Sequence, residues 1–270
     1  MSPANGSGVP GIHFHESKPK NPAFYWVATN SVTRGQHVQT STLAAGRPVL
    51  ILTLSNPEAR NAINPSVYRA AAKAIRATAG FRTVRAIVLR GEGDHFSGGG
   101  DLRRLARQRK LPAAEQRGHI DALHEWLMAI EEAPQPVIAA VEGAAMGGGF
   151  SLSLACDLIV AAEDAKFAMS YINVGLSPDG GGTDSLARAL PPQAALEMLL
   201  DGTPCTARRL HELGVVNKVV PHGEAGAAAL AWAQQLARGP FEGRRASSSS
   251  CMRRADAAGA SSWRPSGSPS

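Results

Sequence analysis

The chain has 270 residues, which suits one sizeable domain, or one domain plus a small appendage, and its hydrophobic fraction of 44% is ordinary for a globular protein. Its net charge of +6 suits a polyanionic ligand such as a nucleotide or CoA, but the basic residues carry no helix-turn-helix, zinc-finger or RNP pattern, so we expect no nucleic-acid partner. Three scattered cysteines argue against a disulfide framework and structural zinc, and they fit a reducing cytoplasm.

The beginning of the chain is loosely patterned. Residues 1–46 are rich in Gly, Pro, Ser, Thr and Asn without a sustained period, so we expect a flexible leader with a short strand near residues 24–28. Regular patterning starts with the apolar run 49–54, which predicts a buried strand. Pro65 then opens a predicted helix through residue 79, because proline is tolerated in the first helical turn.

The middle of the chain repeats one arrangement, in which a buried strand is followed by a glycine-rich loop. The first strand covers 86–89, and Asp101 suits the N-terminus of the helix after its loop. A long helix at about 113–132 leads to the second strand at 136–141, and glycines then open an apolar helix at 148–156.

The remaining elements continue this alternation, which predicts the α/β class. In chain order they are strands at 158–162 and 166–168, helices at about 183–190, 192–200 and 206–213, a strand at 215–220 and an Ala-rich helix at about 223–237. From residue 239 the sequence changes to Arg, Ser, Ala, Gly and Pro without an apolar period. We therefore expect a core over 47–239 and an atypical, disordered tail over 240–270.

No segment reads as a membrane span or a secretory signal. The most apolar region, 137–162, is interrupted by Glu142, Asp157 and a glycine triplet, whereas a span needs about 20 mainly apolar residues. The N-terminus has no apolar core after a basic start. We expect a cytoplasmic protein without membrane association.

Two glycine clusters, 98–100 and 147–149, follow buried strands. Glycine lets a backbone approach a ligand closely, and the second cluster opens a helix whose free N–H groups favour an anion. It lacks the spacing of a dinucleotide fingerprint, a P-loop or a nucleophile elbow. Glycine content alone fits a plain flexible loop, whereas two N–H groups that converge on one oxygen would stabilise a developing oxyanion.

A set of segments in fixed order and spacing makes this interpretation more specific. They are 56–62, 88–102, 136–149, 156–158, 165–167, 175–183 and 213–220. Together they resemble the signatures of the crotonase superfamily, the enoyl-CoA hydratase/isomerase family, over about residues 48–239. The resemblance implies an α/β fold made of a crotonase-like spiral of β-β-α repeats with peripheral helices, usually trimerised through C-terminal helices.

The resemblance also implies a site that binds an acyl-CoA thioester. The backbone N–H groups of Gly100 and Gly148 would form an oxyanion hole for the thioester enolate. CoA would be part of the substrate, so no separate cofactor and no metal are expected. The implied substrate-binding residues are Ala59, Arg60, Ala62, Gly98, Asp101, Leu102, Ser151 and Tyr171.

Two positions depart from the family pattern. Hydratases of this family resemble one another in two glutamates that activate water, and here those positions hold Ser151 and Tyr171, neither of which can act as a carboxylate base. Asp179 occupies a loop position where some isomerases and a dehalogenase of the superfamily carry their working carboxylate. Burial there would raise its pKa and suit it to proton removal, although Asp179 could also merely cap the helix near Thr183.

Three functions stay open from these residues. The first is double-bond isomerisation of an enoyl-CoA with Asp179 as proton shuttle. The second is hydratase-like, dehalogenase-like or thioesterase-like chemistry in the same hole, with Tyr171 as a hydrogen-bond donor. The third is binding of acyl-CoA without catalysis. Because the tail carries no amphipathic stripe, we also expect a family-type homotrimer to be weakened and the acyl end of the pocket to be open to water.

Overall fold

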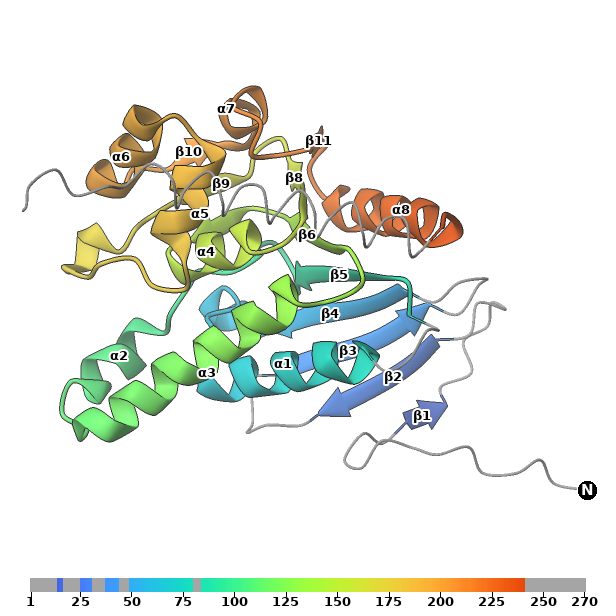
Figure 1. The fold of residues 1–270 in the computed structure, drawn as a ribbon, viewed down its shortest axis with the longest axis horizontal. Coiled ribbons are helices and arrows are strands. Elements are labelled where there is room, and N and C mark those ends of the chain that lie inside the picture. Colours follow the sequence, from blue (N-terminus) through green and yellow to red (C-terminus); the bar gives the residue numbers. More distant parts are fainter. Residues whose placement is uncertain (1–13, 17–24, 31–36, 44–48, 80–83, 241–270) are drawn as a thin grey trace, which may run out of the picture.

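The protein is described by a computed structural model over residues 14–16, 25–30, 37–43, 49–79 and 84–240 (Figure 1). Its largest part is an eight-stranded sheet with the order β1-β2-β3-β4-β5-β6-β8-β11. The parallel strands are β4 (Val49–Ser55), β5 (Ala86–Gly91), β6 (Val137–Val141), β8 (Leu158–Ala162) and β11 (Lys218–Val220). Parallel strands are covered on both faces, which explains their continuous apolar sequences. All five were predicted, but β11 is shorter than 215–220.

Antiparallel strands extend this sheet toward the N-terminus. They are β1 (Phe14–Glu16), β2 (Tyr25–Asn30) and β3 (His37–Leu43). β3 pairs with β4 along its whole length, and Val38 is buried in the core. The sequence predicts only one short strand here, within an otherwise flexible leader, and misses β1 and β3. Their polar residues carry no apolar period, and the backbone bonds to a neighbouring strand form them instead.

Different helices cover the two faces of the main sheet. On one face, α1 (Pro65–Ala79) contacts both β3 and α3 (Ala113–Glu131), as Figure 1 shows. The rings of Tyr68 and Trp126 stack between these two helices with their centroids 5.9 Å apart. The helices therefore form one apolar layer with the side chains that alternate toward them from β4 and β5.

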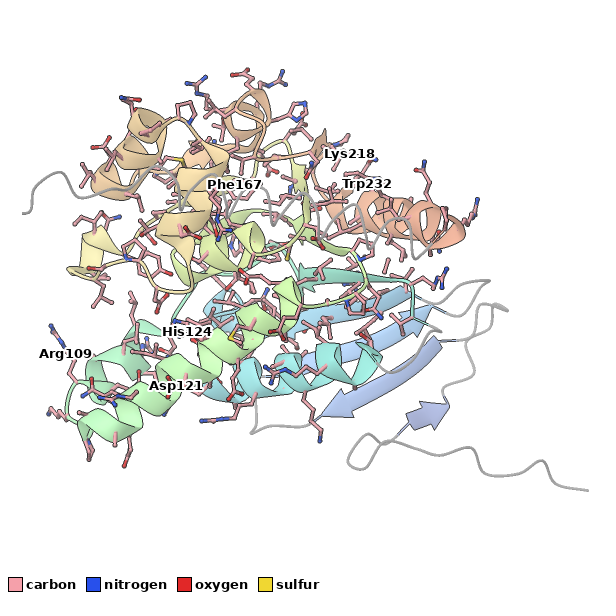
Figure 2. The ribbon with its side chains drawn as sticks, viewed as in Figure 1. Arg109, Asp121, His124, Phe167, Lys218 and Trp232 are labelled. Carbon is pink, nitrogen blue, oxygen red and sulfur yellow. The ribbon has the colours of Figure 1, made fainter. Side chains whose placement is uncertain are left out.

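The other face is covered by α8 (Ala225–Arg238), which contacts β4, β5, β6, β8 and β11. Its buried alanines recur every four residues, so a flat, small-residue stripe faces the sheet. Figure 2 shows Lys218 of β11 beside Trp232 of α8, and the Lys218 ammonium lies 3.9 Å from the centre of the indole ring. This contact fixes the helix against the edge strand.

A second sheet lies beside the first and has the order β10-β9-β7. The chain passes from β6 directly into β7 and then α4, and from β8 into β9 and then η2 and α5. A bridge between Ser97 and Ala145 gives β5 an equivalent continuation before α2. These turns form the predicted spiral of β-β-α repeats. The remaining elements are η1 (Pro57–Ala59), α2 (Leu102–Gln108), β7 (Ala144–Met146), α4 (Gly148–Leu154), β9 (Lys166–Ala168), η2 (Ile172–Val174), α5 (Gly182–Ala189), α6 (Pro192–Asp201), β10 (Cys205–Thr206) and α7 (Ala207–Glu212).

Two short strands were not expected from the sequence. β7 and β10 were not predicted, because strands of two or three residues give no periodic signal. Within the ranges given above, no helix has the length and apolar character needed to cross a membrane. The predicted tail lies outside the described residues from position 241 onward.

Candidate active site

The two glycine clusters meet because they are equivalent parts of successive repeats. Ser97 and Ala145 are bridge partners, and the Ser97 N–H donates to the Ala144 carbonyl at 2.9 Å. Gly100 and Gly148 each follow this bridge pair by the same number of residues. A Cβ atom built on Gly148 would lie 3.9 Å from the backbone nitrogen of Gly100. The fold therefore brings the two predicted donors together.

Both donors are available to a ligand. Among the residues that the structure describes, neither the N–H of Gly100 nor that of Gly148 donates to a backbone carbonyl. Gly148 is the first residue of α4, so its N–H also points from a helix N-terminus, where negative charge is favoured. Two such groups suit an oxygen atom that gains negative charge.

The close approach of the two loops requires glycine at positions 99 and 149, each of which is next to one of the two predicted donors. Gly99 has φ +85°, and a Cβ atom there would overlap the Met146 carbonyl oxygen. A Cβ atom on Gly149 would overlap the carbonyl oxygen of Ser97. Larger residues would push the loops apart, and the two N–H groups would no longer share one acceptor.

The segment predicted to line the CoA pocket is fastened to the first glycine loop. The Gly98 N–H donates to the Arg60 carbonyl at 2.7 Å, and the Ile63 N–H donates to the Gly99 carbonyl at 2.8 Å. Asn61 is buried, and its side-chain amide donates to the carbonyls of Glu92 and His95. Ala59, Arg60 and Ala62 therefore lie beside the loop that carries Gly100, although their contact with a substrate stays a prediction.

Ser151, Tyr171 and Asp179 form a hydrogen-bonded chain next to Gly148. The Tyr171 hydroxyl donates to Oδ1 of Asp179 at 2.7 Å and lies 3.1 Å from the Ser151 hydroxyl. The same phenolic oxygen is 3.6 Å from a Cβ atom built on Gly148. Tyr171, at one position of the hydratase glutamates, thus contacts the surviving acid directly, and Ser151, at the other position, is linked to that acid through Tyr171. Their separation in the sequence did not reveal this chain.

Burial fixes the protonation state of the phenol. Tyr171 is 8% exposed, and burial, followed by the nearby charge of Asp179, raises its pKa well above the ordinary tyrosine value. The phenol therefore keeps its proton at neutral pH and acts as the donor toward Asp179. Asp179 is the acceptor in this pair, and its carboxylate is held in one orientation.

The alternative role predicted for Asp179 is wrong. Helix α5 begins at Gly182 with Gly181 as its N-cap, and no side chain caps it. The burial expected of Asp179 is also not found, because the residue as a whole is exposed, although Tyr171 contacts its Oδ1 atom and its backbone carbonyl. The carboxylate is therefore accessible from outside, which leaves room for a substrate to reach it.

Asp101 and Leu102 were predicted to bind substrate. In the structure, the Asp101 side chain caps a helix and Leu102 is exposed. The Asp101 carboxylate caps α2, since Oδ1 accepts from the backbone N–H groups of Arg103 and Arg104 at 3.0 and 3.1 Å. Leu102 is 57% exposed. Their contact with substrate remains a prediction, whereas the cap explains why α2 starts directly after Gly100.

The sequence missed Tyr68 and Arg104, which are linked electrostatically to the candidate site. Burial raises the pKa of Tyr68 to about 12, the Arg104 guanidinium opposes this rise, and the Asp179 carboxylate adds to it. Both charges therefore act on the same ring. In the sequence Tyr68 reads as a core residue of an amphipathic helix and Arg104 as part of an exposed basic cluster, so no local signal singles them out.

A separate polar cluster lies where α8 begins. Glu142, Asp164 and His222 each offer a potential metal-ligand atom, and these atoms lie within 4.8 Å of one another. The Glu142 carboxylate already accepts from the backbone N–H groups of Gly223 at 3.1 Å and Ala225 at 2.7 Å, and His222 Nδ1 lies 2.9 Å from Asp164. These contacts fasten the N-terminus of α8 to the turn between β6 and β7.

Comparison with known proteins agrees with this architecture. The enoyl-CoA hydratase/isomerase family model matches residues 45–263, which extends past residue 239 into the predicted tail. A crystal structure described as an enoyl-CoA hydratase from a Polaromonas species has 46% sequence identity and a TM-score of 0.77, and the likeness covers 83% of this chain and 85% of that chain. These likenesses confirm the crotonase-type fold that the sequence predicts.

Curated relatives give the same assignment. A 2,3-dehydroadipyl-CoA hydratase of Escherichia coli is 34% identical over 190 residues, which cover 70% of this chain and 72% of that protein. A carnitinyl-CoA dehydratase of Salmonella heidelberg is 38% identical over 195 residues, covering 72% of this chain and 73% of that protein. The chain belongs to the enoyl-CoA hydratase/isomerase family.

Proposed function

We propose that this protein moves the double bond of an enoyl-CoA from the β,γ to the α,β position. The thioester oxygen would accept hydrogen bonds from the N–H groups of Gly100 and Gly148. The Asp179 carboxylate would remove a proton from the α carbon, which gives a dienolate, and would return that proton to the γ carbon. The electron pair of the broken C–H bond becomes part of the conjugated system, so no other reactant is needed.

The observation that carries this proposal is the bond between Tyr171 and Asp179 beside Gly148. It places one carboxylate, held in a fixed orientation, at the side of the two backbone donors. Ser151 and Tyr171 supply no second carboxylate. One positioned base next to an oxyanion hole suits the transfer of one proton between two carbons of the same molecule.

Hydration is the second candidate, and the activities for which the relatives are named favour it. Those relatives are called hydratases or a dehydratase. In that reaction Asp179 would take a proton from water while the oxygen of that water adds to the β carbon, which gives an enolate. Asp179 would then return the proton to the α carbon. The same oxyanion hole would hold the enolate in both reactions.

An absorbance assay separates the two candidates. With 3-hexenoyl-CoA, isomerisation produces the conjugated thioester, so its absorbance rises. With 2-hexenoyl-CoA, hydration removes conjugation, so the absorbance falls. We expect the rise, and we expect Asp179→Asn to lower kcat by about 100- to 10,000-fold, because that is the usual contribution of a positioned acid–base group.

The controls decide what a negative result means. Unchanged turnover in the Asp179→Asn variant would remove Asp179 from the mechanism. A fall with 2-hexenoyl-CoA and no rise with 3-hexenoyl-CoA would favour hydration. Thioester binding by calorimetry without turnover of either substrate would identify a binding protein.

A further inference from the structure

Arg104 lies one helical turn after the residue that forms half of the oxyanion hole. Helix α2 starts at Leu102, directly after Gly100 and Asp101, and its first turn contains Arg104 and Leu105. A Cβ atom built on Gly100 would lie 3.1 Å from Cδ1 of Leu105, so this turn packs against the hole. Arg104 is the third residue of α2, so only about 3 Å of helical rise separates it from the first residue of the helix.

The guanidinium group of Arg104 is partly buried without an acceptor. Its Nε and Nη1 atoms are buried and have no hydrogen-bond partner among the described residues. No carboxylate in the described ranges forms an ion pair with it. Arginine is always charged and its nitrogen atoms can only donate, so covered donors without an acceptor destabilise the empty site.

The charges of Arg104 and Asp179 both act on one residue, Tyr68. Tyr68 is affected by both charges, and the effect of Arg104 on its pKa opposes that of Asp179. Burial lowers the pKa of His119, the Arg104 and Arg69 charges lower it further, and the Glu115 charge opposes this change. Tyr68 and His119 are therefore both within electrostatic range of Arg104, and no carboxylate of the described residues forms an ion pair with its guanidinium.

We propose that Arg104 binds a carboxylate at the far end of the acyl chain, so that the substrates are CoA thioesters of unsaturated dicarboxylic acids. The inference rests on the proposed function for the position of the thioester carbonyl. With that carbonyl at Gly100 and Gly148, the acyl carbons extend past Asp179 toward Tyr68 and Arg104. A planar guanidinium can hold a carboxylate through two parallel hydrogen bonds, which satisfies the covered donors.

Binding of saturated thioesters to the full chain tests this inference without requiring turnover. Adipyl-CoA and hexanoyl-CoA have acyl chains of equal length and differ in the terminal carboxylate. We expect calorimetry to show that adipyl-CoA binds about 10- to 100-fold more tightly, the range expected for hydrogen bonds between charged groups. Glutaryl-CoA and pentanoyl-CoA provide a second matched pair at a shorter chain length.

Variants on the same helix identify the residue responsible. Arg104→Gln should reduce the preference for adipyl-CoA to less than about threefold, and Arg104→Lys should keep part of it, because lysine retains the charge but loses the two-pronged geometry. Arg107→Gln is the matched control, since Arg107 is exposed on the same helix. It should bind both thioesters as the unaltered protein does. Thermal unfolding of each variant checks that it is folded.

Two results would overturn the inference. One is equal binding of adipyl-CoA and hexanoyl-CoA to the unaltered chain. The other is an equal loss for both thioesters in Arg104→Gln, which would assign Arg104 to a phosphate of CoA instead. If the preference for adipyl-CoA is present but no unsaturated thioester is turned over, the proposed isomerisation fails and the assignment of Arg104 stands.

Discussion

Tyr171 is the residue through which the parts of the candidate site are connected. Its hydroxyl contacts Ser151 in α4 and Asp179 in the loop before α5. Its ring lies 3.9 Å from a Cβ atom built on Gly147. Because the phenol is buried and keeps its proton, it can hold the Asp179 carboxylate but cannot itself accept a proton at neutral pH.

This arrangement makes Tyr171 a positioning residue that acts through Asp179. We expect Tyr171→Phe to lower kcat by about 10- to 100-fold, because it removes one charge-assisted hydrogen bond and leaves the ring packing unchanged. A double-mutant cycle with Asp179→Asn checks the route, measured as kcat with 3-hexenoyl-CoA. In the Asp179→Asn background, Tyr171→Phe should have little further effect. Two fully additive losses would show that the phenol acts on the substrate independently.

Sequence reasoning at single positions reached the backbone donors but not the contacts between side chains. Gly100 and Gly148 follow from cluster spacing and family resemblance, and the fold brings them together. The cap predicted as an alternative for Asp179 was wrong, since Pro-Asp-Gly-Gly is good turn chemistry that does not show which helix residue is capped. The electrostatic effect of Arg104 on Tyr68 depends on how α1, α2 and α3 are arranged in space, which no local pattern encodes.

At the scale of elements, long apolar segments were predictable and short or polar strands were not. Helix α1 was predicted with the bounds that the structure has, because proline and amphipathic spacing mark it clearly. β3 escaped prediction, although it pairs with β4 over its whole length. β3 forms a strand because its backbone pairs with β4, so tertiary context outweighs the intrinsic strand propensity of its residues.

Glu142 gives helix α8 a firm starting point. Its carboxylate accepts two backbone N–H groups at the positive end of the helix. We expect Glu142→Gln to lower the free energy of unfolding by about 0.5–2 kcal/mol, the usual size of a lost cap. Urea unfolding followed by tryptophan fluorescence measures this change. Glu224→Gln is the matched control, because Glu224 precedes α8 but makes no side-chain cap bond. An equal loss in the control would contradict the cap.

The whole molecule should lose stability in alkaline solution. Burial raises the pKa values of Tyr68, Tyr171 and Cys156 above their ordinary values of 10.0, 10.0 and 9.0. The unfolded chain therefore releases these protons at lower pH than the folded chain does. Above about pH 9 the unfolded state binds fewer protons, so the free energy of unfolding falls as pH rises, whereas below that pH these groups contribute no dependence.

Tyr68 allows this expectation to be tested at one group. Its pKa rises from 10.0 to about 12, which corresponds to about 2–3 kcal/mol of stability lost between about pH 10 and about pH 12. Urea unfolding of the unaltered protein and of Tyr68→Phe, compared from about pH 8 upward, should show a shallower decline in the variant. Parallel declines would show that the phenol of Tyr68 is not responsible.

If main-chain N–H groups at Gly100 and Gly148 hold the thioester, as we propose, there is a consequence for how such a protein diverges. A main-chain donor is present whatever side chains surround it, provided that the glycine turns are kept. Substitutions at positions 104, 151, 171 and 179 can therefore be sampled by mutation without dismantling the pair of donors. Selection on a library randomised at these four positions should recover variants with new substrate preferences or new fates for the bound thioester, while changes at Gly99 or Gly149 should yield few active members.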